Sequence, residues 1–177
     1  MKTKFNRKLV LFLDFFSMLV LIGLDQYTKY LAVINLKDRP AVPIIKGVFE
    51  LNYLENRGAA FGMLQNQKAF FILIACIILV AIFYVLFKMP EDRKYIWLHM
   101  LLVLIASGAV GNMIDRIRLE YVVDFFYFVL INFPIFNVAD IYVSVACILL
   151  AGVLLFYYKE QDLEFLNIRQ KKIREIR

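Results

Sequence analysis

Two aspartates lie in the apolar stretch "VVDFFYFVLINFPIFNVAD", residues 122–140, and carry its only charges. They are Asp124 and Asp140, and the chain has no lysine or arginine between Arg118 and Lys159 to neutralise them. If the two carboxylates approach each other in a poorly solvated pocket, one carboxyl must keep its proton near neutral pH. An acid beside a base can deprotonate a water, hydrogen-bond a scissile carbonyl and protonate a leaving amine, as in aspartic proteases.

Further polar residues accompany this pair at helical spacing. Asn112, Asp115 and Arg116 lie at positions i, i+3 and i+4, so they share one helix face. Asn137 lies three residues before Asp140 and shares a face with it in the same way. The small residues of "ASGAVG", just before Asn112, let that helix pack closely against a neighbour, which predicts a small polar cavity.

Each of these residues also has a structural interpretation. Asp115 and Arg116 could anchor a helix end as a pair, and Asp140 could cap a helix N-terminus. Asp25 could form an i,i+4 pair with Lys29. Taken together, however, ionisable groups near hydrocarbon are costly and are usually functional, which favours a site.

The elements that must position these residues are membrane spans. The chain is 62% hydrophobic, well above the roughly 45–50% typical of soluble domains. A bilayer core of about 30 Å requires about 20 apolar residues of helix. Four segments meet this requirement, at about residues 9–32, 69–87, 96–114 and 139–158.

Lysine and arginine counts predict the orientation of the spans, because basic residues stay on the cytoplasmic side. Thirteen of the 21 basic residues precede the first span, join the second to the third or follow the fourth. Both termini are therefore predicted to be cytoplasmic, and loops 33–68 and 115–138 to face outward. Asp25 and Asn56 then meet the polar residues described above at one depth, near the outer face of the membrane.

The outer loops and the C-terminal tail have different patterns. "VFELNYL" alternates apolar and polar residues and can pair with the preceding "AVPIIKGV", which predicts a small extracytoplasmic β-sheet. "FFYFVLINFPIF" is too short to span and contains Pro134, so we expect an interfacial or partly re-entrant outer loop. Residues 159–177 are predicted to form a basic cytoplasmic helix that contacts lipid headgroups. The fold class is an all-α membrane protein with four transmembrane helices, and residues 1–177 are predicted to form a single domain.

The distribution of charge, cysteine and histidine disfavours other classes of function. The net charge of +6 lies mainly at the chain ends and in one short loop, so membrane lipids rather than nucleic acid are the expected partners. Cys76 and Cys147 lack a CxxC spacing and His99 is the only histidine, so no metal or cofactor is expected. His99 is interpreted as a helix-face residue without chemistry, and Asp14 as an isolated acid near the inner end.

Five short motifs carry a resemblance to a known family. In chain order they are "DQYTK", "NRGAAFG", "GNMIDR", "VVDF" and "FNVAD", beginning at Asp25, Asn56, Gly111, Val122 and Phe136. Each motif alone is weak, but five in this order over about residues 9–158 are specific. On these motifs the sequence closely resembles the bacterial lipoprotein signal peptidases, also called signal peptidase II.

The resemblance implies a membrane aspartic endopeptidase whose catalytic residues are Asp124 and Asp140. It implies that substrate is bound at or beside the site by Asn56, Asn112, Arg116, Asn137, Asp25 and Asp115. The implied substrates are diacylglyceryl-modified prolipoproteins, cut on the N-terminal side of the modified cysteine. The implied location is the bacterial cytoplasmic membrane, with the active site near its outer face, and globomycin-type inhibitors are implied to bind there.

One position departs from the family pattern, and two other functions compete with this interpretation. Ile141 follows "FNVAD" where many members have serine, which puts the fine tuning of Asp140 in doubt. A proton-coupled transporter would also use membrane carboxylates. However, the acids cluster at the outer end, and the second and fourth spans carry nothing ionisable at mid-depth. A non-enzymatic assembly subunit could use Asp115 and Arg116 at an interface, but it leaves Asp124 and Asp140 without a role.

Overall fold

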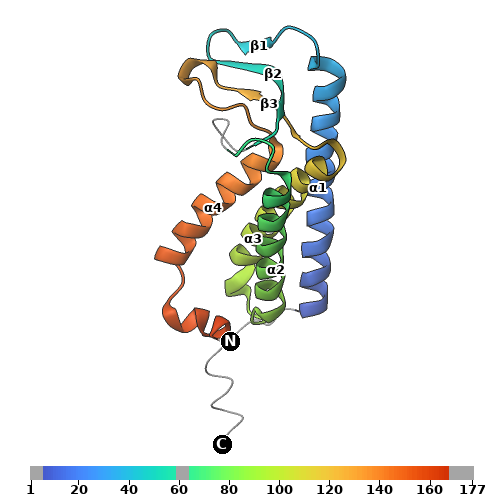
Figure 1. Cartoon of the computed structure of the whole chain (residues 1–177). Helices are drawn as coiled ribbons and strands as arrows, with labels where there is room; N and C mark the ends of the chain where they lie inside the picture. Colours follow the sequence, from blue (N-terminus) through green and yellow to red (C-terminus); the bar gives the residue numbers. More distant parts are fainter. Residues whose placement is uncertain (1–5, 59–63, 168–177) are drawn as a thin grey trace, which may run out of the picture.

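The computed structural model describes residues 6–58 and 64–167, and four long helices dominate it (Figure 1). All four are long and apolar enough to cross a membrane. This confirms the predicted fold class, with helix ends that differ from the predicted spans by a few residues. The helices are α1 (Arg7–Leu36), α2 (Lys68–Lys88), α3 (Ile96–Leu119) and α4 (Val138–Phe156).

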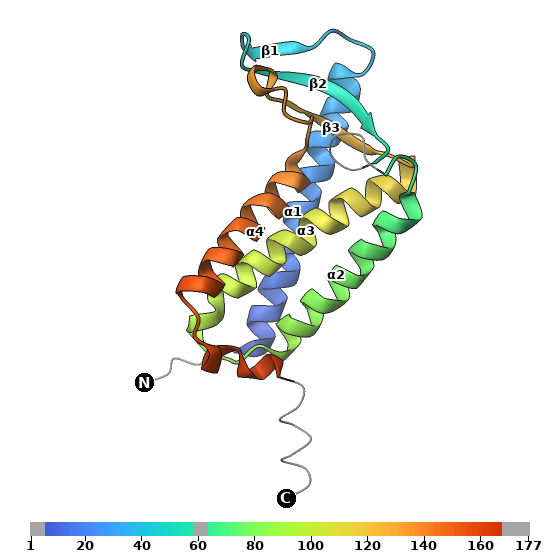
Figure 2. The same cartoon turned by 60° about the vertical axis from the view of Figure 1, so that its left-hand side comes forward.

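Helix α3 is the central helix of the bundle, and Figure 2 shows it between α4 and α2, with α1 behind. In its most apolar part 56% of the residues are buried, compared with 6%, 17% and 11% in α1, α2 and α4. The apolar side chains on the outer faces of those three helices are exposed in the way a lipid-facing surface requires.

Two glycines of α3 allow the close helix packing that the sequence predicts. A Cβ atom on Gly108 would lie 2.5 Å from the carbonyl oxygen of Ala139, and one on Gly111 would lie 2.5 Å from the carboxylate of Asp25. Any larger residue would push α4 or α1 away. The glycines therefore determine how near Asp25 and the start of α4 come to α3.

A three-stranded antiparallel sheet covers one end of the bundle, which we call the sheet end (Figure 1). Its strands are β1 (Val42–Ile45), β2 (Phe49–Asn56) and β3 (Val122–Tyr127), in the order β1-β2-β3. The pairing of β1 with β2 confirms the predicted hairpin. Gly47, at φ 74°, lies in the turn between them.

Strand β3 corrects the prediction for the second loop, because part of the expected interfacial segment belongs to the sheet. The first four residues of β3 are all buried, so the strand lacks the alternation that reveals a half-buried strand in a sequence. The rest of that loop contains a short 3₁₀ turn, η3 (Val129–Ile131), and an extended return to α4.

The opposite end of the bundle, which we call the base, is where α1 begins and α4 ends. There the loop between α2 and α3 contains η2 (Arg93–Tyr95), and α4 is followed by the 3₁₀ helix η4 (Glu160–Leu166). The described part of the predicted basic helix 159–177 is therefore a 3₁₀ helix, and it packs on the core through Leu163 and Phe165. Residues 168–177 of that prediction lie outside the described residues.

Candidate functional site

Asp124 and Asp140 come from different elements and are linked at the sheet end through Asn137. Asp124 lies in β3, and Asp140 lies in the first turn of α4. Beside them is a pocket of about 450 Å³. Its polar walls include Asn56, Arg116 and Asp140, and its apolar walls come from residues 133–136 and from the first two turns of α4.

Asp124 is almost completely buried and is held by two amide side chains. Its Oδ2 accepts a hydrogen bond of 2.8 Å from Nδ2 of Asn56, and its Oδ1 accepts one of 2.6 Å from Nδ2 of Asn137. Burial, and secondarily the negative charge of Asp140, raises the pKa of Asp124 to about 7, although the two amide hydrogen bonds oppose this rise.

Asp140 is connected to Asp124 through Asn137. The two residues form a capping box, in which the Asn137 backbone N–H donates to Oδ2 of Asp140 at 3.1 Å and the Asp140 backbone N–H donates to Oδ1 of Asn137 at 3.0 Å. The other oxygen of Asp140 accepts from Nδ2 of Asn112 at 2.8 Å. The predicted capping interaction of Asp140 is therefore present, in a residue that also lines the pocket.

A lysine that the sequence suggested only as a local partner lies at the centre of the site. Nζ of Lys29 is 2.9 Å from Oδ2 of Asp25, 3.0 Å from Oδ2 of Asp115 and 2.9 Å from Oδ1 of Asn112. The i,i+4 pair with Asp25 is confirmed. Asp115, in contrast, pairs with Lys29 from α1, and no salt bridge joins it to the neighbouring Arg116 among the described residues, so the alternative of an Asp115–Arg116 pair is not seen there.

Asp25 and Asp115 fix the backbone next to the two central carboxylates. Oδ1 of Asp25 accepts from the backbone N–H of Ala139, and Oδ2 of Asp115 accepts from that of Val123, at 2.9 and 3.1 Å. Each of these amides directly precedes Asp140 or Asp124 in the chain. The two acids therefore position the pair, and their predicted contact with substrate stays a prediction.

Gln26 is a second residue that the sequence did not single out. Its Nε2 donates to Oδ1 of Asp115 at 2.9 Å and to the carbonyl oxygen of Gly111 at 3.2 Å, which ties α1 to α3. The motif "DQYTK" could have indicated the roles of both Gln26 and Lys29, because a glutamine and a lysine in a membrane helix need polar partners.

Arg116 lies on the wall of the pocket. Its guanidinium carbon lies 4.6 Å from the centre of the Phe71 ring, and its two NH groups donate to the carbonyl oxygens of Asn112 and Gly58 at 3.4 and 3.3 Å. Gly58 in turn donates its backbone N–H to Oδ1 of Asn56. Residues 59–62 of the motif "NRGAAFG" lie outside the described residues.

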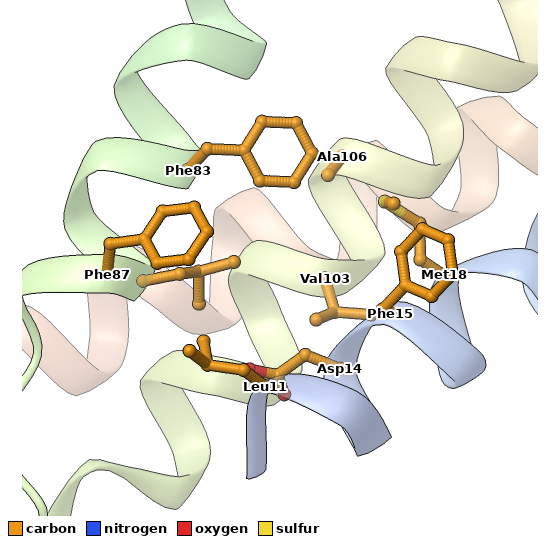
Figure 3. A pocket seen from close by; sticks show the side chains of 9 residues that line it. Leu11, Asp14, Phe15, Met18, Phe83, Phe87, Val103 and Ala106 are labelled. Atoms are coloured by element: carbon orange, nitrogen blue, oxygen red, sulfur yellow. The ribbon is translucent and has the colours of Figure 1, made fainter. Parts of the chain in front are cut away.

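The base holds a polar contact that the sequence analysis missed. Nδ1 of His99 lies 2.6 Å from Oδ2 of Asp14, which joins α3 to α1. The interpretation of Asp14 as an isolated acid is therefore wrong, and His99 is its partner. The two residues are 85 positions apart, and nothing local in the sequence links them. Asp14 also borders an apolar cavity of about 100 Å³ between α1, α2 and α3 (Figure 3).

The fold and the site together define an integral membrane protein of four helices with a buried carboxylate pair beside a pocket. The sequence model of the family described as "Signal peptidase (SPase) II" matches residues 17–156. The chain therefore belongs to the signal peptidase II family, and this membership makes it a peptidase.

Individual relatives agree with this assignment. A lipoprotein signal peptidase of Streptococcus thermophilus is 45% identical over 146 residues, which cover 82% of this chain and 92% of that protein. One from Caldanaerobacter subterraneus subsp. tengcongensis is 47% identical over 76% of this chain and 90% of that protein. A solved structure described as a bacterial membrane enzyme is 30% identical and has a TM-score of 0.75, over 90% of this chain and 97% of its own.

Proposed function

We propose that this chain is an aspartic endopeptidase that removes signal peptides from prolipoproteins within the membrane, with Asp124 and Asp140 as the catalytic pair. Removal of signal peptides is the activity that family membership supports. The observation that carries the catalytic assignment is that Asn137 hydrogen-bonds both carboxylates beside the pocket. We further propose that residues 1–177 form one peptidase domain.

The reaction uses a single proton shared by the pair. Because Asp124 has a pKa of about 7 beside Asp140, the two carboxyls hold one proton between them near neutral pH. The ionised carboxylate takes a proton from a water, which attacks the scissile carbonyl. The protonated carboxyl hydrogen-bonds the carbonyl oxygen as negative charge develops there. A carboxyl then delivers a proton to the leaving amine, which completes the cleavage.

The surrounding residues divide into a positioning set and a binding set. Asp25, Lys29 and Asp115 hold the backbone and Asn112 in place without reaching the pocket lining. Asn56 and Arg116 face the pocket and, with Asn112 and Asn137, are proposed to hydrogen-bond the substrate backbone. For Asp25 and Asp115 we propose a place beside the bound substrate and no hydrogen bond to its backbone.

The proposed orientation rests on the distribution of basic residues, and the proposed substrate rests on the depth that this orientation gives the site. The positive-inside rule places the base on the cytoplasmic side and the sheet end at the outer face of the bacterial cytoplasmic membrane. A cysteine carrying diacylglycerol lies at that depth with its acyl chains in the bilayer. The proposed cut is N-terminal to this cysteine, and membrane lipids and globomycin-type inhibitors are proposed to contact the same site.

The test is cleavage of a diacylglyceryl-modified prolipoprotein, beside its unlipidated form, by the wild type, Asp124→Asn and Asp140→Asn. Each variant should fold but lose about 10²–10⁴-fold in kcat, because general acid–base catalysis contributes about that much. Asp38→Asn is the matched control, since Asp38 is exposed and asparagine tolerates its φ of 58°. Near-normal turnover in either site variant would refute the catalytic pair, and a wild type that never cuts would refute the peptidase.

A further inference from the structure

The segment after α4 is fastened to the loop between α2 and α3 by several contacts. The hydroxyl of Tyr158 donates to the carbonyl oxygen of Lys94 at 2.8 Å, and the hydroxyl of Tyr95 donates to that of Asp162 at 2.8 Å. The two tyrosine rings stack with centroids 5.6 Å apart, and the Phe165 ring packs edge-on against Tyr95. Lys94 and Asp162 form an ion pair. We call residues 158–166 with Lys94 and Tyr95 the clasp.

The clasp runs beneath α3 at the base, from the end of α4 towards α2 (Figure 2). Its η4 helix contacts α2. The α3 residues along this side are buried near the base, as Leu98 and Ile105 are, and partly exposed near the sheet end, as Ala109 and Arg116 are. The space between α2 and α4 is therefore closed at the base and open at the site.

An apolar stripe on α4 leads from the pocket down to the clasp. Ile141 and Val145 line the pocket, and Ile148 and Leu155 continue it at helical spacing, with exposures rising from 39% and 46% to 72% and 74%. Gly152 lies between the last two, and a Cβ atom there would meet nothing within 4 Å. The stripe is an exposed apolar face of α4 that begins at the pocket, and the chain enters the clasp at Tyr158, just after the end of the helix.

We propose that the clasp acts as a stop that limits the length of the apolar segment a substrate signal peptide can place along this stripe. This inference rests on the proposed function. Asp140 and Phe156 are separated by 16 residues of helix, or about 24 Å at 1.5 Å per residue. A substrate helix held at Asp140 therefore reaches the clasp after about 16 residues. The apolar region of a signal peptide, typically about 7–15 residues, fits above the stop.

The experiment measures kcat/KM for lipidated substrates whose apolar segment is lengthened by none, four or seven leucines. In the wild type, seven added leucines should lower kcat/KM about tenfold, equivalent to about 1.4 kcal/mol, because the helix must leave the stripe or displace the clasp. Asp162→Ala removes the bonds to Lys94 and to the Lys159 N–H and should reduce this loss to less than about threefold. It should leave cleavage of the unlengthened substrate unchanged.

The control is Lys68→Ala, which removes an exposed ion pair with Glu120 and should keep the wild-type length dependence. A purely structural clasp would alter stability without altering the dependence on substrate length. If Asp162→Ala does not fold, the milder Lys94→Ala variant and the wild-type series still decide the question. If the wild type cleaves all three substrates with the same kcat/KM, the clasp does not limit substrate length. The stripe would then be only a lipid-facing surface. If no substrate is cleaved, the proposed function fails and the inference fails with it.

Discussion

The sheet end and the base of the bundle both join separate elements through polar contacts, but they balance charge differently. At the base the contacts are one-to-one, Asp14 with His99 and Lys94 with Asp162. At the sheet end Lys29 serves two carboxylates, and Asp124 and Asp140 form no salt bridge within the described part of the chain. An excess of buried acid cannot stay fully ionised, so it holds a proton that can be transferred. The comparison teaches that the two clusters differ in charge balance, and the excess of acid at the sheet end is what the proposed catalysis uses.

The largest expected effect comes from removing the lysine of the sheet end. Lys29→Met leaves Asp25 and Asp115 buried without their cation, and we expect the free energy of unfolding to fall by about 3–5 kcal/mol. Thermal unfolding in detergent measures this loss. Lys68→Met, which breaks an exposed pair, should cost at most about 1 kcal/mol. Equal effects of the two substitutions would contradict the buried network.

The pH dependence of turnover comes next. With the pKa of Asp124 at about 7, the pair loses its shared proton as the pH rises through neutrality, so kcat should fall on the alkaline side. At low pH the second carboxyl is protonated and kcat should fall again. Initial rates between about pH 4 and 9 should therefore give a bell-shaped profile. A flat profile would argue against the pair.

The pH dependence of unfolding gives an independent check of the pKa of Asp124. Folding raises the pKa of Asp124 from 3.8 to about 7. Between these two pH values the folded state therefore binds a proton on Asp124 more tightly than the unfolded state does. The stability due to this group is present below pH 3.8 and is lost as the pH rises to about 7. Asp124→Asn should remove this part of the pH dependence of unfolding, and an unchanged slope in the variant would contradict the assignment.

A smaller effect is expected at Arg116. Arg116→Lys replaces a planar group, which stacks on Phe71 and donates to Gly58, with a point charge that cannot do both. Turnover should fall about tenfold, or about 1.4 kcal/mol, while the unfolding temperature stays within error. Arg118→Lys, at an exposed position on the same helix, is the matched control. Unchanged kinetics for Arg116→Lys would show that the guanidinium of Arg116 does not contribute to turnover.

The smallest effect belongs to the base. Asp14→Leu leaves the buried His99 unpaired, His99→Leu leaves the partly buried Asp14 unpaired, and each should cost about 1–3 kcal/mol of stability. The double variant should recover most of this loss, because an apolar pair can replace a buried polar one. Peptidase activity of all three should remain at the wild-type level. Loss of turnover in a folded single variant would give the base a role in catalysis and end the contrast between the two regions.

Much of the candidate site was visible in the sequence, because each polar residue stood out against an apolar run. Asp124, Asp140, Asn112 and Asn137 were all identified, and the structure joins them by hydrogen bonds. The role of Lys29 was underestimated, because its contact with Asp115 crosses from α1 to α3. Spacing along one helix reveals partners three or four residues away and nothing across helices.

The sequence by itself determined the four helices, the pairing of β1 with β2 and the family motifs, because apolar length and alternation are local properties of the chain. The tertiary structure alone decided that β3 joins the sheet, that Asp14 meets His99 and that the segment after α4 folds under the base. These contacts join residues 64–85 positions apart. Their formation depends on how the helices pack around the small residues of α3, and no local pattern encodes that arrangement.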